Sequence, residues 1–123
     1  MSEFSILIVD DEEEFVATLV QRLRKRGWAG EGVLTGSAAI AMIAAHDFAL
    51  VLLDMRLPDM DGGQVLREIK KIRPQSRVVI LTGHASVSEG EEGLKNGAYD
   101  YLLKPVEFET LLEKLQAARN RSP

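Results

Sequence analysis

Short apolar runs alternate with longer amphipathic stretches along the whole chain. The first run, residues 5–9, is rich in β-branched residues and apolar on both faces, which is typical of a strand buried in a parallel sheet. Behind it, apolar positions recur at helical spacing, and basic residues gather in the last turn before Gly27, a residue type that often ends a helix. The pattern therefore predicts a buried strand followed by an amphipathic helix.

The same alternation continues to the end of the chain. The expected strands are, in order, residues 5–9, 28–34, 49–53, 77–81 and 98–103, and a helical pattern follows each of them. The second strand has the weakest pattern, and the helix after it opens near Ser37. Ser86 and Glu89 form a capping box that starts the fourth helix, which should end at Gly97. Because right-handed crossovers build this arrangement most readily, the pattern predicts an α/β fold with a five-stranded parallel sheet and helices on both faces.

Composition narrows the class of protein further. The chain has 123 residues, 46% of them hydrophobic and 28% charged, so we expect one globular domain spanning residues 1–123. The absence of cysteine excludes zinc fingers, thiol catalysis and disulfide scaffolds. A net charge of −4 gives no reason to expect direct nucleic-acid binding. No signal peptide or bilayer-length apolar stretch is visible, so a cytoplasmic protein is expected. Residues 119–123 read as a fraying tail or the start of a linker.

Polar residues follow four of the five expected strands at the point where each strand ends. The first strand is followed by Asp10 and Asp11, the third by Asp54, the fourth by Thr82 and the fifth by Lys104. The second strand ends in nothing reactive. Ligands of open parallel sheets bind beyond the carboxyl ends of the strands, so this placement predicts a single site there.

Three grouped carboxylates repel one another unless a proton or a cation lies between them. Since the set offers oxygen ligands without cysteine or paired histidine, magnesium is the expected ion, and magnesium favours phosphate substrates. Within such a site Asp54 would be the nucleophile, while Thr82 and Lys104 would contact the phosphoryl oxygens. Each residue taken alone also has a structural interpretation. Asp10 and Asp11 could open an acidic helix start, and the others could be ordinary strand-end side chains.

Four motifs resemble those of response-regulator receiver domains, in the same order, and the resemblance extends over essentially the whole chain. They are Asp10-Asp11-Glu12, the segment 54–62 (DMRLPDMDG), the segment 81–85 (LTGHA) and the segment 97–105 (GAYDYLLKP). The resemblance implies a flavodoxin-like fold of five βα units with strand order 2-1-3-4-5. It also implies a signalling switch, standing alone or excised from a longer response regulator or hybrid kinase.

The resemblance assigns roles to the site residues. Asp54 would accept a phosphoryl group from a sensor histidine kinase or a phosphotransfer protein. Asp11 would bind magnesium directly and Asp10 largely through water, with the backbone carbonyl of Arg56 as a further ligand beside Asp54. Thr82 and Lys104 would bind the phosphoryl group.

Other positions are assigned by the same resemblance. The Lys104–Pro105 bond is expected to be cis. Tyr101 matches an aromatic residue that turns inward on activation, although the sequence alone favours a half-buried tyrosine of the strand. Arg56 and His84 occupy positions that modulate the lifetime of the phosphate, although His84 could equally be an inert loop residue. The surface formed by the fourth helix, fifth strand and last helix commonly carries contacts with an output domain, a partner protein or a second copy.

The expected fourth helix contains two glycines, Gly90 and Gly93, each of which should cost about 1 kcal/mol relative to alanine. We therefore expect a helix of low local stability. The alternative is that the glycines only permit close packing.

Two functions from other classes remain open. A magnesium phosphotransferase or phosphatase could use the same aspartate, but phosphatases of the haloacid-dehalogenase type carry a second aspartate where this chain has Arg56. A binding domain that keeps the fold without phosphorylation is disfavoured, because the whole phosphorylation set is present. The sequence therefore favours a switch that does not turn over an external substrate.

Overall fold

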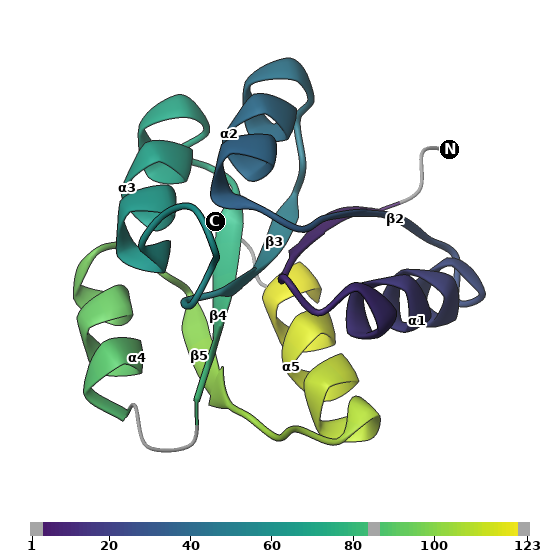
Figure 1. Cartoon of the computed structure of the whole chain (residues 1–123). Coiled ribbons are helices and arrows are strands. Elements are labelled where there is room, and N and C mark those ends of the chain that lie inside the picture. The colour runs from purple at the N-terminus through teal and green to yellow at the C-terminus, as the bar shows by residue number, and fades with distance from the viewer. Residues whose placement is uncertain (1–3, 84–86, 121–123) are drawn as a thin grey trace.

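Parallel strands and helices alternate without exception in the computed structural model, which describes residues 4–83 and 87–120 (Figure 1). The strands are β1 (Phe4–Val9), β2 (Trp28–Val33), β3 (Leu50–Asp54), β4 (Arg77–Thr82) and β5 (Asp100–Leu103). The helices are α1 (Glu13–Arg24), α2 (Gly36–Ala45), α3 (Gly62–Ile72), α4 (Val87–Lys95) and α5 (Phe108–Asn120). The sheet order β2-β1-β3-β4-β5 confirms the expected fold.

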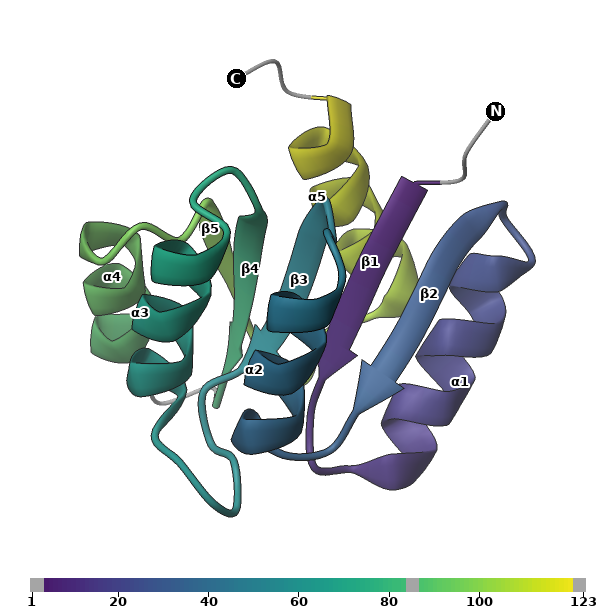
Figure 2. The same cartoon turned by 90° about the horizontal axis from the view of Figure 1, so that it is seen from above.

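Helices cover both faces of the sheet, as the view from above shows (Figure 2), and an apolar cluster lies on each face. On one face α1 and α5 pack against β1 and β3 through residues such as Leu23 and Leu115, both fully buried. On the other face α2, α3 and α4 lie over the sheet, with Ile43 and Ile69 fully buried there. Because both faces are covered, the central strands are apolar at almost every position, which explains why their sequence pattern is continuous rather than alternating.

Most element boundaries agree with the expected ones, and two differ, at the start of β5 and the end of α5. The helix after β2 begins at Gly36, close to the expected start near Ser37, because the Thr35 side chain accepts a hydrogen bond from the Ala38 N–H and acts as the N-cap. Strand β5 begins at Asp100 rather than at residue 98. The expected tail is wrong at its start, since α5 continues to Asn120. The expected cap at residue 86 and residue 84 of the third motif lie outside the described residues.

The far end of α5 is attached to the sheet at the edge opposite the carboxyl ends of the strands. The Arg77 guanidinium donates to the Ala118 carbonyl at 2.8 Å. Arg119 lies over the rings of Phe4 and Trp28, with its guanidinium carbon 5.1 and 5.3 Å from the two centroids. Trp28 is 2% exposed, so the end of α5 seals the only tryptophan of the chain.

The glycines of α4 permit close packing, as the alternative interpretation held. A Cβ atom on Gly90 would overlap the ring of Tyr101 on β5, and one on Gly93 would overlap the tip of Ile80 on β4. The Tyr101 ring therefore lies directly against the α4 backbone. The low local stability of this helix stays a prediction. None of the helices in the part of the chain that the structure describes has the length and apolar character needed to cross a membrane.

The two glycines should respond differently to alanine, although both gain helix propensity of about 1 kcal/mol. Gly93→Ala is expected to be neutral or stabilising, because the Ile80 tip that must move is the end of a flexible side chain. Gly90→Ala is expected to destabilise by about 1–2 kcal/mol. Its added Cβ would meet Cγ and Cδ1 of the Tyr101 ring, which lie close to the strand backbone and cannot move far. Urea unfolding of both variants measures this difference, and equal midpoints would contradict it.

Candidate functional site

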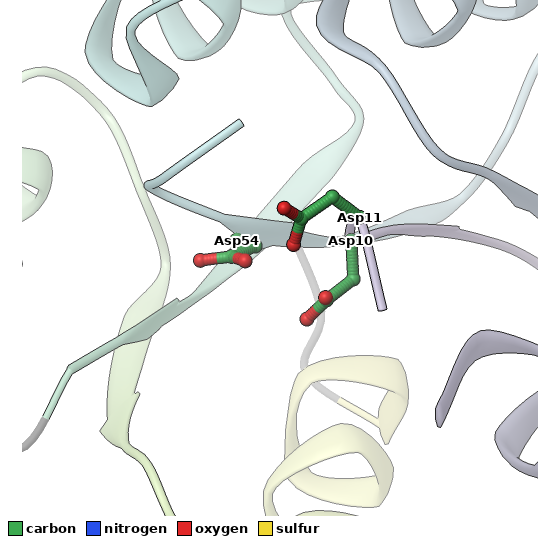
Figure 3. A group of neighbouring side chains, drawn as sticks. All are labelled: Asp10, Asp11 and Asp54. Atoms are coloured by element: carbon green, nitrogen blue, oxygen red, sulfur yellow. The ribbon is translucent and has the colours of Figure 1, made fainter. Parts of the chain in front are cut away.

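The carboxylates that follow β1 and end β3 meet at the carboxyl edge of the sheet (Figure 3). These two strands are hydrogen-bonded neighbours, which places Asp10 and Asp11 beside Asp54. One oxygen from each of the three carboxylates lies within 4.8 Å of the others. The grouping that the strand ends predicted is therefore present in the fold.

The three carboxylates differ in exposure. Asp10 is 0% and Asp54 5% exposed, whereas Asp11 faces solvent. Asp10 is also fixed on both sides, because its Oδ1 accepts the Glu12 N–H at 2.9 Å and its own N–H donates to the Val33 carbonyl at 3.2 Å. Two buried carboxylates at one site require a compensating positive charge.

Lys104 supplies that charge from the end of β5. Its Nζ lies 2.8 Å from Asp10 Oδ2, 3.3 Å from Asp54 Oδ2 and 3.2 Å from Glu12 Oε1. The Lys104–Pro105 bond is cis, as expected. One ammonium thus joins β1, β3 and β5 at the carboxyl edge.

Burial and charge oppose each other at this site. The pKa of Asp54 lies above its usual value, chiefly because the side chain is buried. The Arg56 N–H and Lys104 lower this pKa, whereas the negative charge of Asp10 raises it further. Burial alone would lower the pKa of Lys104, but its contacts with Asp10, Asp54 and Glu12 outweigh burial and raise it. The Lys104 ammonium therefore stays charged at neutral pH. Burial makes the ionised form of Asp54 less favourable than it is in water.

Thr82 bonds to the Lys104 backbone, and Arg56 bonds to the Asp54 side chain. Thr82, at the end of β4, is fully buried; its hydroxyl donates to the Gly83 carbonyl at 3.0 Å, and its own carbonyl accepts the Lys104 N–H at 2.7 Å. The Arg56 N–H donates to Asp54 Oδ1 at 3.1 Å. Asp54 is therefore oriented by a backbone donor on one oxygen and by the ammonium on the other.

Glu12 and Phe15 also belong to this neighbourhood, and sequence reasoning assigned them no part in it. Glu12 is the third carboxylate on Lys104, and the Phe15 ring centroid lies 5.7 Å from the ammonium. Glu12 belongs to the first of the four motifs, but the resemblance assigns it no role. Its position directly after the Asp10-Asp11 pair was a signal that could have drawn attention to it.

The donor set fits a hard divalent cation. All three side chains offer carboxylate oxygens, and this is the single group of such ligands close enough to share an ion among the described residues. Oxygen-only sites of this kind suit magnesium, calcium or manganese rather than zinc or copper.

A family model for the response regulator receiver domain matches residues 6–116. The chain belongs to this family. The receiver domain is 41% identical over 115 residues to the transcriptional regulatory protein ZraR of Escherichia coli K12, a match that covers 92% of this chain and 26% of ZraR. It thus spans about a quarter of the length of that relative.

Solved receiver structures are similar over nearly the whole chain. The CheY-like receiver domain protein of Methanospirillum hungatei is 36% identical, with a TM-score of 0.89 over 94% of this chain and 93% of that one. A response regulator of Burkholderia pseudomallei, solved with a phosphorylated aspartic acid, calcium ion and citrate, is 28% identical, with a TM-score of 0.83 over 96% of this chain and 74% of that one.

Proposed function

We propose that this receiver domain is a signalling switch that accepts a phosphoryl group on Asp54 in a magnesium-dependent reaction. The observation that carries the proposal is the placement of Asp54. It is a buried carboxylate at a strand end, beside two further carboxylates and in contact with the Lys104 ammonium. The phosphorylated aspartic acid and the calcium ion of the Burkholderia relative support the assignment.

The donor would be a phosphohistidine of a sensor histidine kinase or of a phosphotransfer protein. One oxygen of Asp54 forms a bond to phosphorus as the bond between phosphorus and the imidazole nitrogen breaks, and the imidazole nitrogen recovers an electron pair. Lys104 and Thr82 would then bind phosphoryl oxygens, the first with a fixed charge and the second with its hydroxyl.

Asp10, Asp11, Asp54 and the backbone carbonyl of Arg56 would hold the Mg²⁺ ion. When bound, the ion neutralises negative charge on the transferred group. The protein's own contribution is to keep these oxygens in place. Asp10 does this through its two backbone-linked hydrogen bonds, and Asp54 through the Arg56 N–H.

Phosphorylation would change the surface formed by α4, β5 and α5 and so control a partner protein, an output domain or a second copy of the chain. We place the switch in the cytoplasm and expect no direct contact with nucleic acid or membrane. We treat residues 1–123 as one receiver domain that stands alone or belongs to a longer response regulator or hybrid kinase. The chemistry serves the domain's own aspartate, so no external phosphate ester should be turned over.

The decisive experiment is an intact-mass measurement. The protein is incubated with acetyl phosphate and Mg²⁺, and we expect one added phosphoryl mass. Asp54→Asn and a chelator control should each abolish it, because the first removes the acceptor and the second the ion. Absence of the added mass with acetyl phosphate and with a phosphorylated histidine kinase would refute the proposal. Repeated turnover of a phosphate ester would favour an enzyme instead.

A further inference from the structure

The segment from the end of β2 to the start of α2 bonds to the acidic site at Asp10 and to the loop after β3 at Asp59. At its start, the Val33 carbonyl accepts the Asp10 N–H at 3.2 Å. At its end, the first backbone N–H groups of α2 donate to Asp59, which belongs to the loop after β3. The Gly36 N–H lies 2.8 Å from Asp59 Oδ1, and the Ser37 N–H lies 3.0 Å from Asp59 Oδ2. Both oxygens of Asp59 are thus engaged by a helix that is 22 or more residues away in sequence.

Asp59 lies three residues after Arg56, in the loop between β3 and α3. Arg56 stands at the beginning of the loop, where its N–H donates to Asp54. Arg56 also forms an isolated antiparallel bridge with Asp61, near the end of the loop. The Gly62 N–H donates to the Met55 carbonyl at 3.1 Å. These bonds close the loop upon itself. The two bonds of Asp59 attach it to the neighbouring helix.

An apolar contact next to Asp59 also connects the loop to the start of α2. A Cβ atom on Gly36 would lie 2.8 Å from Val65 Cγ2 and 2.9 Å from Met60 Sδ. Met60 is therefore seated directly on the start of α2, at a point where only glycine leaves room. A hydrogen-bonded contact and an apolar contact, from adjacent loop residues, fix the loop to one helix end.

The charge on Asp59 suits this arrangement. The Gly36 and Ser37 N–H groups hold the pKa of the Asp59 carboxyl below its usual value. The N-terminus of a helix carries partial positive charge, which favours an anion at this position. At neutral pH the carboxylate therefore keeps both bonds.

We propose that Asp59 is a positioning residue for the metal site, because it anchors the Arg56 loop to α2 and so restricts where the Arg56 carbonyl can lie. The inference rests on the proposed function, since it takes the Arg56 carbonyl as a Mg²⁺ ligand. The β2–α2 connection then supports the site from two directions, through Val33 on Asp10 and through α2 on Asp59.

Calorimetric titration of the whole chain with Mg²⁺ tests the proposal. Asp59→Ala removes both bonds and should weaken Mg²⁺ binding about tenfold, the lower end of the effect of groups that orient a metal ligand. Asp59→Asn keeps one acceptor oxygen and should lie between Asp59→Ala and the natural protein. Thr35→Val is the matched control, because it removes the N-cap of the same helix while leaving Asp59 attached. It should bind Mg²⁺ as the natural protein does.

A second readout separates positioning from catalysis. The rate of Asp54 phosphorylation by acetyl phosphate should fall in Asp59→Ala at low Mg²⁺ and recover at saturating Mg²⁺. An effect of charge alone would make Asp59→Asn equal to Asp59→Ala.

Each result has a distinct meaning. Unchanged Mg²⁺ affinity in Asp59→Ala overturns the inference and leaves the proposed function standing. Equal losses in Asp59→Ala and Thr35→Val also overturn it, because the effect would then be general weakening of α2. Equal losses in Asp59→Ala and Asp59→Asn overturn it in favour of charge. If the natural protein binds no Mg²⁺, the proposed metal site fails and this inference fails with it.

Discussion

Replacing Lys104 with methionine is expected to destabilise the metal-free protein by about 2 kcal/mol, which is about 8 °C in thermal midpoint for a domain of this size. The variant leaves Asp10 and Asp54, both almost fully buried, without the ammonium that contacts them at 2.8 and 3.3 Å. Removing one partner of a fully buried pair costs about 3–5 kcal/mol. We expect less because the Lys104 side chain is 25% exposed and solvent screens part of the interaction.

Magnesium should restore much of the stability lost in Lys104→Met. An ion that binds only the folded protein stabilises it by mass action, and it would bring positive charge back to the same carboxylates. The expected result is a midpoint that depends on Mg²⁺ far more steeply in the variant than in the natural protein. Thermal unfolding with and without Mg²⁺ measures it.

Lys71→Met is the control for Lys104→Met, since Lys71 forms a largely exposed ion pair with Glu68 and its loss should matter little. Equal midpoints for the two variants would contradict the prediction.

The stabilisation by Lys104 should not depend on pH below the alkaline range. The folded-state pKa of Lys104 is raised, so its stabilisation is complete below the ordinary lysine pKa and is lost only as the pH rises through the folded-state value.

Asp11→Asn is expected to weaken Mg²⁺ binding by more than the roughly ten- to hundredfold cost of removing a group that merely supports a ligand. Asp11 belongs to the three-carboxylate group, yet it is exposed. Its replacement should therefore leave the unfolding midpoint of the metal-free protein almost unchanged. Calorimetric titration and urea unfolding on the same sample separate the two properties.

Asp10→Asn provides the contrast to Asp11→Asn. Asp10 is fully buried and is bonded to the Glu12 N–H and to Lys104, so its replacement should alter both ion affinity and stability. If Asp11→Asn lowers stability as much as Asp10→Asn does, or leaves Mg²⁺ affinity intact, the assignment of Asp11 as a direct ligand is wrong.

The central part of the fold was predictable because its signals are local. Strands β1, β3 and β4 are apolar on both faces, and the helix stops at Gly27 and Gly97 coincide with positive φ angles of 84° and 105°. The weak pattern of β2 has a tertiary cause. A Cβ atom on Gly32 would overlap Val16 of α1, so close packing of the helix removes the side chain that would have marked the strand.

The grouping of the site residues was predictable for a similar reason. Strand ends of a parallel sheet share one edge, so counting reactive residues at those ends located Asp10, Asp54 and Lys104 together. The roles of these residues in phosphorylation and metal binding stay predictions.

Contacts between distant segments were not accessible from the sequence. The Glu12–Lys104 contact spans 92 residues and the Asp59–Gly36 bond spans 23, and no periodicity relates such positions. Both carboxylates also have ordinary local interpretations, one as part of an acidic helix start and the other as a loop residue. Only the folded arrangement of the β2–α2 connection reveals what Asp59 holds.

The attachment of the end of α5 gives the protein an optical probe of its own. Trp28 is the only indole in the chain, and the Arg119 guanidinium and the Phe4 ring lie against it. Its emission therefore reports the local environment at the edge of the sheet opposite the carboxylates. Trp28 and Asp54 lie at opposite ends of the strands. A change in Trp28 emission when Asp54 is modified would therefore show, without an added label, that the structural effect extends along the full length of the strands.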